Sequence, residues 1–310
     1  MTDRPNVLLI TSDQQHWMTL GVQNPKIKTP NLDRLAAGGT LFNRAYCPNP
    51  TCTPTRASII TGQYPSQHGG WTLGTKLPER AHCVGDDFDA AGYHTALVGK
   101  AHFQPLAGTE EYPSLEAYPV LQDLDFWRDF NDVFYGFRHV ELARNHTDEA
   151  HVGQHYALWM EEKGCSNWRD YFRPPTGTRT SKAHAWEIPE EFHYNTWIAE
   201  RSCAQMDAAI DAGKPFLLWS SFFDPHPAYF IPEPWASMYK PEDMELYDFD
   251  VAELADKPPH FAMTQDPDAD WSSYWESGKG LHGCHYHGYA QDYLRKVKAV
   301  YFGMVSMMDH

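Results

Sequence analysis

Three short apolar runs constrain the fold of this chain more than any other feature of its sequence. They read NVLLITSD from Asn6, HTALVGK from His94 and KPFLLWSSFF from Lys214. Short, continuous hydrophobic runs of this kind are typical of strands that are buried on both faces of a parallel sheet. Helical patterns lie between the runs, so strand and helix alternate along the chain. This alternation predicts an α/β fold with a mostly parallel central sheet and helices on both faces.

Two helices can be located from the signals at their ends. The first, TPNLDRLAAGG, begins with Thr29 as a candidate cap and Pro30 in its first turn, and the pair Gly38–Gly39 ends it. A second helix is predicted from about Asn195 to Asp211. It ends at Gly213, just before the third apolar run.

The composition is that of an ordinary globular protein, and it narrows the range of partners. The chain has 310 residues and a formal charge of −16 at pH 7, which argues against nucleic-acid binding. No window approaches the about 20 apolar residues of a membrane span, and the short apolar run from Val7 is too brief for a signal-peptide core. The six scattered cysteines do not indicate a disulfide framework. We therefore expect a cytoplasmic protein that binds neither nucleic acid nor membrane.

Each apolar run is followed at once by polar side chains. Asp13 and Gln14 follow the first run, Lys100 and His102 the second, and His226 the third. Any one of these residues could simply cap a helix or complete a structural hydrogen bond. Ligands of open parallel sheets, however, bind beyond the carboxyl ends of the strands. The convergence of an acid, a lysine and two histidines on that edge predicts a site there.

A further candidate lies in the stretch CTPTRASIITG, which begins at Cys52. Pro54 fits a first helical position with Thr53 as the cap, which places Cys52 just outside a helix N-terminus. The free N–H groups and the dipole of such a terminus favour a thiolate or a bound anion. Arg56, one turn into the helix, could fork onto a tetrahedral oxyanion. The plainer alternative is a buried cysteine beside a helix start, with a surface arginine.

The stretch CTPTRASIITGQYPSQHG resembles the signature of the sulfatase family, C-x-P-x-R followed by a short helix and T-G-x-x-P-x-x-H-G. The matching positions are Cys52, Pro54, Arg56, Thr61, Gly62, Pro65, His68 and Gly69. Further blocks resemble the family in its order: RPNVLLITSDQ, TPNLDRLAAGGTLFNRAYC (a helix and a strand), GYHTALVGKAHF, FLLWSSFFDPHPAY, and VYFGMVSMMDH as the start of a helix.

The resemblance implies an alkaline-phosphatase-like fold of the arylsulfatase or phosphonate monoester hydrolase type. Residues 1–310 would form the N-terminal part of the catalytic α/β domain, and the small C-terminal domain of the family would be absent from this chain. Two segments, about 104–190 and 228–288, are rich in Pro, Trp and Tyr without steady periodicity. We expect them to be loop-rich insertions with short elements, packed over the sheet edge and the site.

The resemblance also implies the chemistry. A formylglycine-generating enzyme would oxidise Cys52 to formylglycine, whose hydrate attacks the sulfur of a small-molecule sulfate ester and forms a covalent sulfate hemiester. Asp13, Gln14 and modified Cys52 would bind one divalent metal, and Arg56 would stabilise the hydrate. Lys100 would bind the sulfate oxygens. His102 would orient or deprotonate the second hydroxyl, and His226 would contact the sulfate or the leaving oxygen, with general acid catalysis as one role for it.

Two departures from the family pattern leave alternatives open. Many sulfatases have two adjacent aspartates where this chain has Asp13-Gln14, so the site loses one negative charge. Ca²⁺ remains the first expectation for the metal, with Mn²⁺ or Mg²⁺ as alternatives, and hydrolysis of phosphonate monoesters or phosphodiesters is the second functional hypothesis. The remaining metal ligands of the family are expected beyond residue 310. A non-catalytic anion-binding relative is the third hypothesis, and assembly into a homo-oligomer is also expected.

The cluster LHGCHYHGY contains His282, Cys284, His285 and His287. Imidazole and thiolate ligands suit Zn²⁺, but these four residues lie too close together for one tetrahedral site to use them all. We therefore predict a substrate-pocket loop here in preference to a second metal site.

Overall fold

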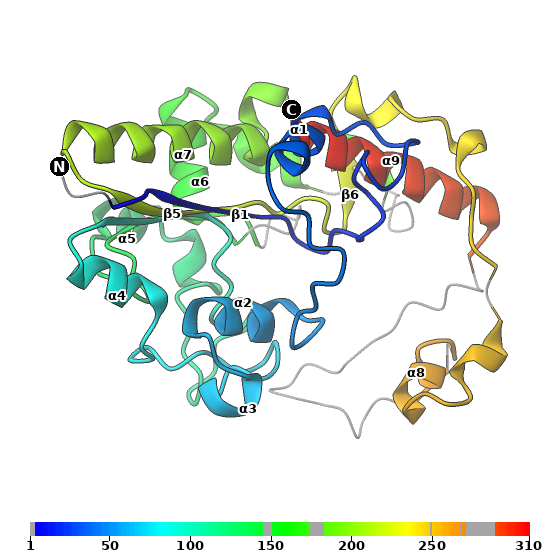
Figure 1. The fold of residues 1–310 in the computed structure, drawn as a ribbon, viewed down its shortest axis with the longest axis horizontal. Coiled ribbons are helices and arrows are strands. Elements are labelled where there is room, and N and C mark those ends of the chain that lie inside the picture. The colour runs from blue at the N-terminus through cyan, green and yellow to red at the C-terminus, as the bar shows by residue number, and fades with distance from the viewer. Residues whose placement is uncertain (1–3, 145–150, 174–182, 249, 267, 271–288) are drawn as a thin grey trace.

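The computed structural model describes residues 4–144, 151–173, 183–248, 250–266, 268–270 and 289–310. Within these residues, four parallel strands form a central sheet in the order β1-β5-β2-β3. The strands are β1 (Val7–Thr11), β5 (Phe216–Ser221), β2 (His94–Gly99) and β3 (His139–Leu142). The parallel sheet of the sequence prediction is thereby confirmed, and its three apolar runs are three of these strands (Figure 1).

Helices cover both faces of the sheet, as predicted (Figure 1). One face carries α6 (Gln154–Glu162) and α7 (Tyr194–Asp211), whose tryptophans and tyrosines form a core with Phe216 and Leu218 of β5. The other face carries α2 (Cys52–Thr61), α3 (Pro65–His68), α4 (Val84–Ala90) and α5 (Leu124–Asp129). Side chains from α2 and α5 pack there on Leu97, Leu217 and Trp219.

The expectation of strands buried on both faces holds for β2 and β5 but is wrong for β1. Every residue of β5, and all but the first of β2, is buried. In β1 the side chains alternate, so that Leu8 is 42% exposed and Ile10 is 54% exposed. Among the described residues β1 is an edge strand that pairs with β5 alone, so only one of its faces is packed into the core.

A second layer forms around α9 (Gln291–Asp309), which contacts α1 (Pro30–Gly38) and a two-stranded sheet of β4 (Ala183–Ala185) and β6 (Tyr229–Ile231). The sequence VYFGMVSMMDH, expected to start a helix, is instead the last part of this 19-residue helix, which begins about two and a half turns earlier in the chain, at Gln291.

The helix α1 is capped from a distant part of the chain. Thr29 stands at the N-cap position, but its hydroxyl makes no capping bond, contrary to the prediction. That hydroxyl accepts the N–H of Gly21 (2.7 Å) and donates to Asp33 (3.0 Å). The carboxylate of Asp309 accepts the N–H groups of Asn31 (3.0 Å) and Leu32 (2.6 Å) instead. The end of α9 therefore holds the beginning of α1.

The strand expected after α1 is not formed. Residues 40–51 have no regular structure, and Phe42 and Tyr46 are 75% and 87% exposed. A strand needs a neighbour for its hydrogen-bond ladder, and no described strand lies beside this segment.

The two segments expected to be loop-rich contain more structure than their composition indicates. The first contributes β3 and α6, which complete the sheet and one of its cores, and neither was predicted. The second contributes β6 and α8 (Pro259–Met263), which lies apart from the sheet in Figure 1. Short 3₁₀ turns complete the described structure at Val120–Gln122, Trp168–Phe172, Glu190–Phe192, Trp235–Ser237, Pro241–Asp243 and Val251–Leu254.

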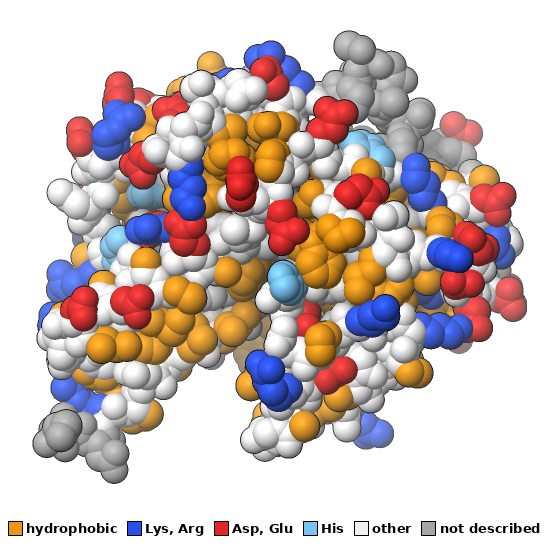
Figure 2. All heavy atoms as spheres, turned by 90° about the horizontal axis from the view of Figure 1, so that it is seen from above, with side chains coloured by type: hydrophobic (Ala, Val, Ile, Leu, Met, Phe, Trp, Pro, Cys, Tyr) orange, Lys and Arg blue, Asp and Glu red, His pale blue; other side chains and the backbone are white. Residues whose placement is uncertain are grey.

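The surface over α7 carries interspersed acidic and basic side chains with hydrophobic patches between them (Figure 2). The five cysteines in the described ranges are all free thiols. None of the helices in those ranges has both the length and the apolarity to cross a membrane.

Candidate active site

The parallel register brings the ends of three strands together at one edge of the sheet. Thr11 pairs with Ser221, and Ser221 pairs with Gly99. Two backbone bonds continue this alignment beyond the strands, from the N–H of Lys100 to the carbonyl of Ser221 (3.0 Å) and from the N–H of Asp13 to the carbonyl of Asp224 (3.1 Å). Asp13, Lys100 and His226, which follow the three strands, therefore lie close together at this edge, as the sequence predicted.

Asp13 is the buried anion of the site. Its carboxylate lies 2.6 Å from Nζ of Lys100 and 3.2 Å from Nη2 of Arg56, and all three side chains are buried. Burial alone would raise the pKa of Asp13, but the charges of Lys100 and Arg56, with His226, hold it well below its usual range. Asp13 is therefore a carboxylate at neutral pH.

Arg56 ties the strand ends to α2. Its Nη1 donates to the carbonyl of Lys100 (2.8 Å) and to the hydroxyl of Ser221 (2.7 Å), while Nη2 faces Asp13. The side chain is 5% exposed, so the alternative of a surface arginine is wrong. Ser221, the last residue of β5, was not singled out from the sequence, although it stands at the carboxyl end of a predicted strand.

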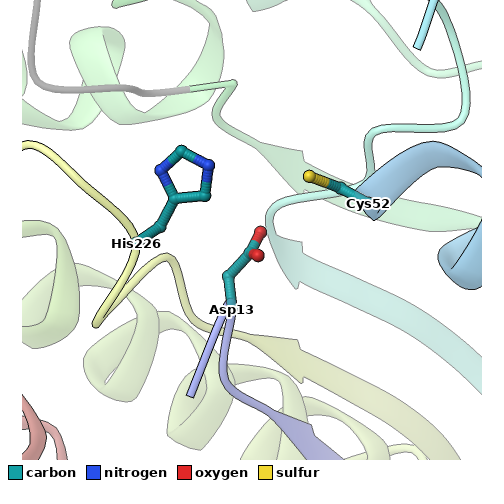
Figure 3. A group of neighbouring side chains, drawn as sticks. All are labelled: Asp13, Cys52 and His226. Atoms are coloured by element: carbon teal, nitrogen blue, oxygen red, sulfur yellow. The ribbon is translucent and has the colours of Figure 1, made fainter. Parts of the chain in front are cut away.

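Cys52 is the first residue of α2, with Thr51 at the N-cap position. The prediction that Cys52 lies just outside the helix, with Thr53 as its cap, is wrong by two residues. Asn49 orders the turn before the helix, because its side-chain oxygen accepts the N–H of Thr51 (2.8 Å). Cys52 is half-buried, and its thiol points toward Asp13 and His226 (Figure 3).

The ligand atoms of Asp13, Cys52 and His226 all lie within 4.8 Å of one another. They come from the end of β1, the start of α2 and the loop after β5 (Figure 3). A hard divalent cation such as Ca²⁺ lies 2.3–2.6 Å from its oxygen ligands, so two ligand atoms of one ion are about 5 Å apart at most. The spacing and the ionised Asp13 therefore fit such an ion, and an oxygen in place of the Cys52 sulfur would fit it better.

His226 has the protonation state of a ligand. Burial, and next the charge of Lys100, lower the pKa of His226 to about 4. Its Nδ1 is hydrogen-bonded to the backbone carbonyl of Pro227. Because a carbonyl can only accept, Nδ1 carries the ring hydrogen and Nε2 has the lone pair. This state favours a metal ligand or a hydrogen-bond acceptor over the general acid considered from the sequence. Gln14 is exposed, and its backbone carbonyl oxygen, not its side chain, accepts from the hydroxyl of Tyr301 (2.9 Å). Its assignment as a metal ligand stays a prediction.

His102 is buried and has a left-handed backbone (φ 56°). Its ring is hydrogen-bonded to Arg144, and its backbone N–H donates to the buried carboxylate of Glu116 (2.7 Å). Neither Arg144 nor Glu116 was found from the sequence. Arg144 lies two residues beyond the end of β3, near the sheet edge where Lys100 directly follows β2, but the sequence does not predict β3.

Asp224 connects Asp13 to the start of α7. Its backbone carbonyl accepts the N–H of Asp13, and its side-chain carboxyl accepts from the hydroxyl of Tyr194 (2.5 Å) and the amide of Asn195 (2.7 Å). Full burial raises the pKa of Asp224 to about 7, although these two hydrogen bonds oppose the rise. Burial also lowers the pKa of the neighbouring His193 to about 3.

The second half of the sequence signature serves structure. Gly62 ends α2 in the left-handed conformation (φ 67°), and its N–H bonds to the carbonyl of Ser58 (2.9 Å). Nε2 of His68 lies 3.0 Å from the hydroxyl of Ser58, which ties α3 to α2. The cluster His282, Cys284, His285 and His287 lies outside the described residues.

Three comparisons place this geometry among known proteins. The family model described as "Sulfatase" matches residues 5–310. The chain is 30% identical over 285 residues to an uncharacterized sulfatase, YidJ, of Escherichia coli strain K12. The aligned region covers 92% of this chain and 50% of that protein. An arylsulfatase of Clostridium perfringens is 28% identical over 320 residues, which cover 99% of this chain and 57% of that protein.

A phosphonate monoester hydrolase of Agrobacterium radiobacter shares the fold, with a TM-score of 0.70 and 24% identity over 99% of this chain and 57% of that one. The chain thus spans about half the length of the curated relatives it matches. The expected alkaline-phosphatase-like sulfatase fold is confirmed. With the family model covering nearly every residue and the strand ends converging on Cys52, the chain belongs to the sulfatase family.

Proposed function

We propose that the protein that contains this chain is a metal-dependent hydrolase that cleaves sulfate esters through a formylglycine at position 52. The observation that carries the proposal is the position of the Cys52 side chain. It lies with Asp13 and His226 at the edge where Arg56 and Lys100 bring two buried positive charges. The positive charges would bind an anionic ester, and the side chains of Asp13 and His226 would bind a divalent cation, both next to the nucleophile at position 52.

A thiol at position 52 is not the nucleophile of this proposal. A maturation enzyme that reads the C-x-P-x-R sequence supplies the oxidant and converts Cys52 to the aldehyde, which adds water to give a hydrate with two hydroxyls. One hydroxyl loses its proton and attacks sulfur, the S–O bond to the alcohol oxygen breaks with its electron pair on that oxygen, and that oxygen takes up a proton as the alcohol leaves. The second hydroxyl then loses its proton, the carbon–oxygen bond to sulfate breaks, and the aldehyde is restored.

The residues of the chain bind and orient the reactants. Nζ of Lys100 lies 2.6 Å from Asp13 and has further N–H groups that can donate to sulfate oxygens, whose negative charge grows in the transition state. Arg56 is fixed by the Lys100 carbonyl and Ser221, so it is already oriented before substrate binds. Asp13, modified Cys52 and His226 would hold the divalent cation, with Gln14 as a predicted further ligand. When bound, the cation lowers the pKa of the attacking hydroxyl and neutralises ester oxygens.

Peptide mass spectrometry of the protein from its native host tests the modification. The tryptic peptide Ala45–Arg56 contains position 52, and in the formylglycine form it is lighter than the cysteine form because an oxygen replaces the sulfur and two hydrogens are lost. A purely unmodified peptide from the native host would remove the basis of the mechanism. Activity is then measured with 4-nitrophenyl sulfate, before and after a chelator, with Cys52→Ala as the control that cannot be modified.

A second candidate function is hydrolysis of phosphonate monoesters or phosphodiesters in the same site. The observation that favours it is the neutral Gln14 after Asp13, which leaves the site with one negative charge fewer than two adjacent aspartates would give, and the fold shared with the phosphonate monoester hydrolase of Agrobacterium radiobacter supports it. The ratio of kcat/KM for 4-nitrophenyl sulfate to that for 4-nitrophenyl phenylphosphonate decides between the two. A ratio below one would make the phosphonate the preferred substrate, while activity toward neither ester in the modified protein would favour a non-catalytic anion-binding relative.

A further inference from the structure

The turn that follows β1 has an uncommon backbone conformation at the residue after Asp13. Gln14 has φ 57°, in the left-handed region that residues other than glycine keep only where their surroundings require it. Gln14 is exposed, so the packing of its own side chain does not explain this conformation. A contact with a distant helix does.

The hydroxyl of Tyr301, on α9, closes this turn. It donates to the backbone carbonyl of Gln14 (2.9 Å) and accepts the backbone N–H of His16 (2.7 Å). A phenol hydroxyl can donate and accept at the same time, so one side chain makes both bonds. The backbone on the two sides of Gln15 is thereby held at one point, which fixes the direction of the chain after Asp13.

The ring of Tyr301 is held in place by its packing. It lies edge-on against the ring of Tyr229, with the centroids 5.9 Å apart, and it packs on the hydrophobic core around Phe302. Tyr229 begins β6, which lies beside α9, and it follows His226 by three residues (Figure 1). Tyr301 therefore contacts the turn of Asp13 and also the strand that follows the loop of His226.

Two backbone anchors hold the carboxylate of the site. The N–H of Asp13 donates to the carbonyl of Asp224 (3.1 Å), and the carbonyl of Gln14 accepts from Tyr301 (2.9 Å). Water could also satisfy the exposed carbonyl of Gln14, so the bond from Tyr301 adds little to stability, but water cannot fix where that carbonyl lies. Without the hydroxyl, Gln14 can relax to the negative φ that is ordinary for its residue type, and the peptide that joins it to Asp13 turns.

We propose that Tyr301 is a positioning residue for the divalent cation, which holds the left-handed conformation of Gln14 and thereby the direction in which Asp13 and Gln14 face the ion. Ligand distances in cation sites vary by only about 0.2 Å, so a turned peptide is enough to weaken binding. The inference rests on the cation site of the function proposed above, but it does not depend on which ester the protein hydrolyses.

The test compares two tyrosine variants of the full protein in its formylglycine form. Tyr301→Phe removes the hydroxyl and keeps the ring. Tyr239→Phe does the same at a second tyrosine that packs on α9, whose hydroxyl accepts the N–H of Lys28 (2.8 Å) and is bonded to the hydroxyl of Ser306 (2.7 Å). Each variant loses two hydrogen bonds next to α9, but those of Tyr301 lie at the turn of Asp13.

The quantity measured is the dissociation constant of Ca²⁺, obtained by competition with a chromophoric chelator after bound metal has been removed. We expect Tyr301→Phe to raise this constant about 10-fold, the size that loss of an outer contact of a metal ligand typically has. Tyr239→Phe should leave it unchanged, although the buried hydroxyl of Tyr239 contributes more to stability and its loss should lower the urea midpoint further. Saturating Ca²⁺ should restore the kcat of Tyr301→Phe, which a general structural defect would not allow.

The outcomes distinguish this inference from the proposed function. Equal Ca²⁺ affinity in Tyr301→Phe and the unsubstituted protein would overturn the inference, as would an equal loss of affinity in Tyr239→Phe. An unsubstituted protein that binds neither Ca²⁺ nor Mn²⁺ would overturn it together with the cation site. Weaker Ca²⁺ binding in Tyr301→Phe, with no hydrolysis of either ester by the unsubstituted protein, would keep the inference and defeat the proposed function.

A second measurement decides if Tyr301→Phe does not fold. The amino acid 3-fluorotyrosine at position 301 keeps the hydroxyl, and its ¹⁹F resonance should shift when Ca²⁺ binds, because the hydroxyl is bonded to the turn that holds the ion. The resonance of 3-fluorotyrosine at position 239 should not shift. Equal responses at the two positions, or none at position 301, would contradict the inference.

Discussion

The buried carboxyl of Asp224 offers a direct test of how the site is supported. Asp224 is fully buried, and its pKa is raised to about 7 from an ordinary value of 3.8. Below both values it is protonated in the folded and the unfolded chain and has no effect on the free energy of unfolding. As pH rises above 3.8, the unfolded chain loses the proton while the folded protein keeps it, so stability falls until pH passes about 7.

The size of this effect follows from the two pKa values. At about 1.4 kcal/mol for each pKa unit, the full difference corresponds to about 4 kcal/mol, of which about 2–3 kcal/mol is lost between pH 5 and pH 8. In Asp224→Asn the amide stays neutral. Its oxygen can accept from Asn195 and its NH₂ can donate to the hydroxyl of Tyr194, so both hydrogen bonds at this position can be kept.

Urea unfolding at pH 5 and at pH 8 measures the difference. Between pH 5 and pH 8, the free energy of unfolding of the unsubstituted protein should fall by about 2–3 kcal/mol more than that of Asp224→Asn. Asp292→Asn is the control, because the side chain of Asp292 is fully exposed and should leave the pH dependence unchanged. Equal pH dependence in Asp224→Asn and the unsubstituted protein would show that Asp224 is ionised and compensated in the folded state, which would refute the reasoning.

Two further substitutions test the framework of the fold. Asp309→Ala removes the carboxylate that caps α1 and should lower the free energy of unfolding by about 2 kcal/mol, seen as a lower urea midpoint with an unchanged slope. Asp309→Asn, which keeps an acceptor, should lose less, and equal losses would argue against the cap. Gly99→Ala should fail to give soluble protein, because Gly99 has φ 105° and an added Cβ would lie 2.0 Å from the carbonyl oxygen of Ser221. Gly38→Ala, where a Cβ meets nothing within 4 Å, is the control.

Sequence reasoning located the site well where the signals are local. A short apolar run predicts a strand without reference to the rest of the chain, and the carboxyl ends of parallel strands share one edge. Those two facts sufficed to bring Asp13 and Lys100 together, and their side chains lie 2.6 Å apart in the structure. The position of Arg56 one helical turn beyond Cys52 could also be predicted, because a helix has a fixed number of residues per turn.

The same reasoning failed where the deciding contact is distant in sequence. Thr29 has the residue type of a helix cap, but Asp309, which lies 278 residues from Asn31, supplies the capping carboxylate. Nothing in the sequence around Thr29 reveals that competitor. The alternating exposure of β1 is similar, because an apolar run does not show how many neighbours its strand has. Arg144 was missed because β3, a run of only four residues, carries too little pattern to mark its carboxyl end.

The buried charges support the proposed anionic substrate independently of the sequence signature. Glu116 offsets Arg144, and Asp13 offsets one of the two cations Arg56 and Lys100. One buried positive charge then remains uncompensated among the described residues at this edge of the sheet, and a divalent cation bound there would add to it. An uncompensated buried charge is costly to folding unless a counter-charge binds. In the function proposed above, an ester oxyanion or an ionised formylglycine hydrate would supply that counter-charge, so we expect the site to bind an anion more tightly than the neutral alcohol that would leave it.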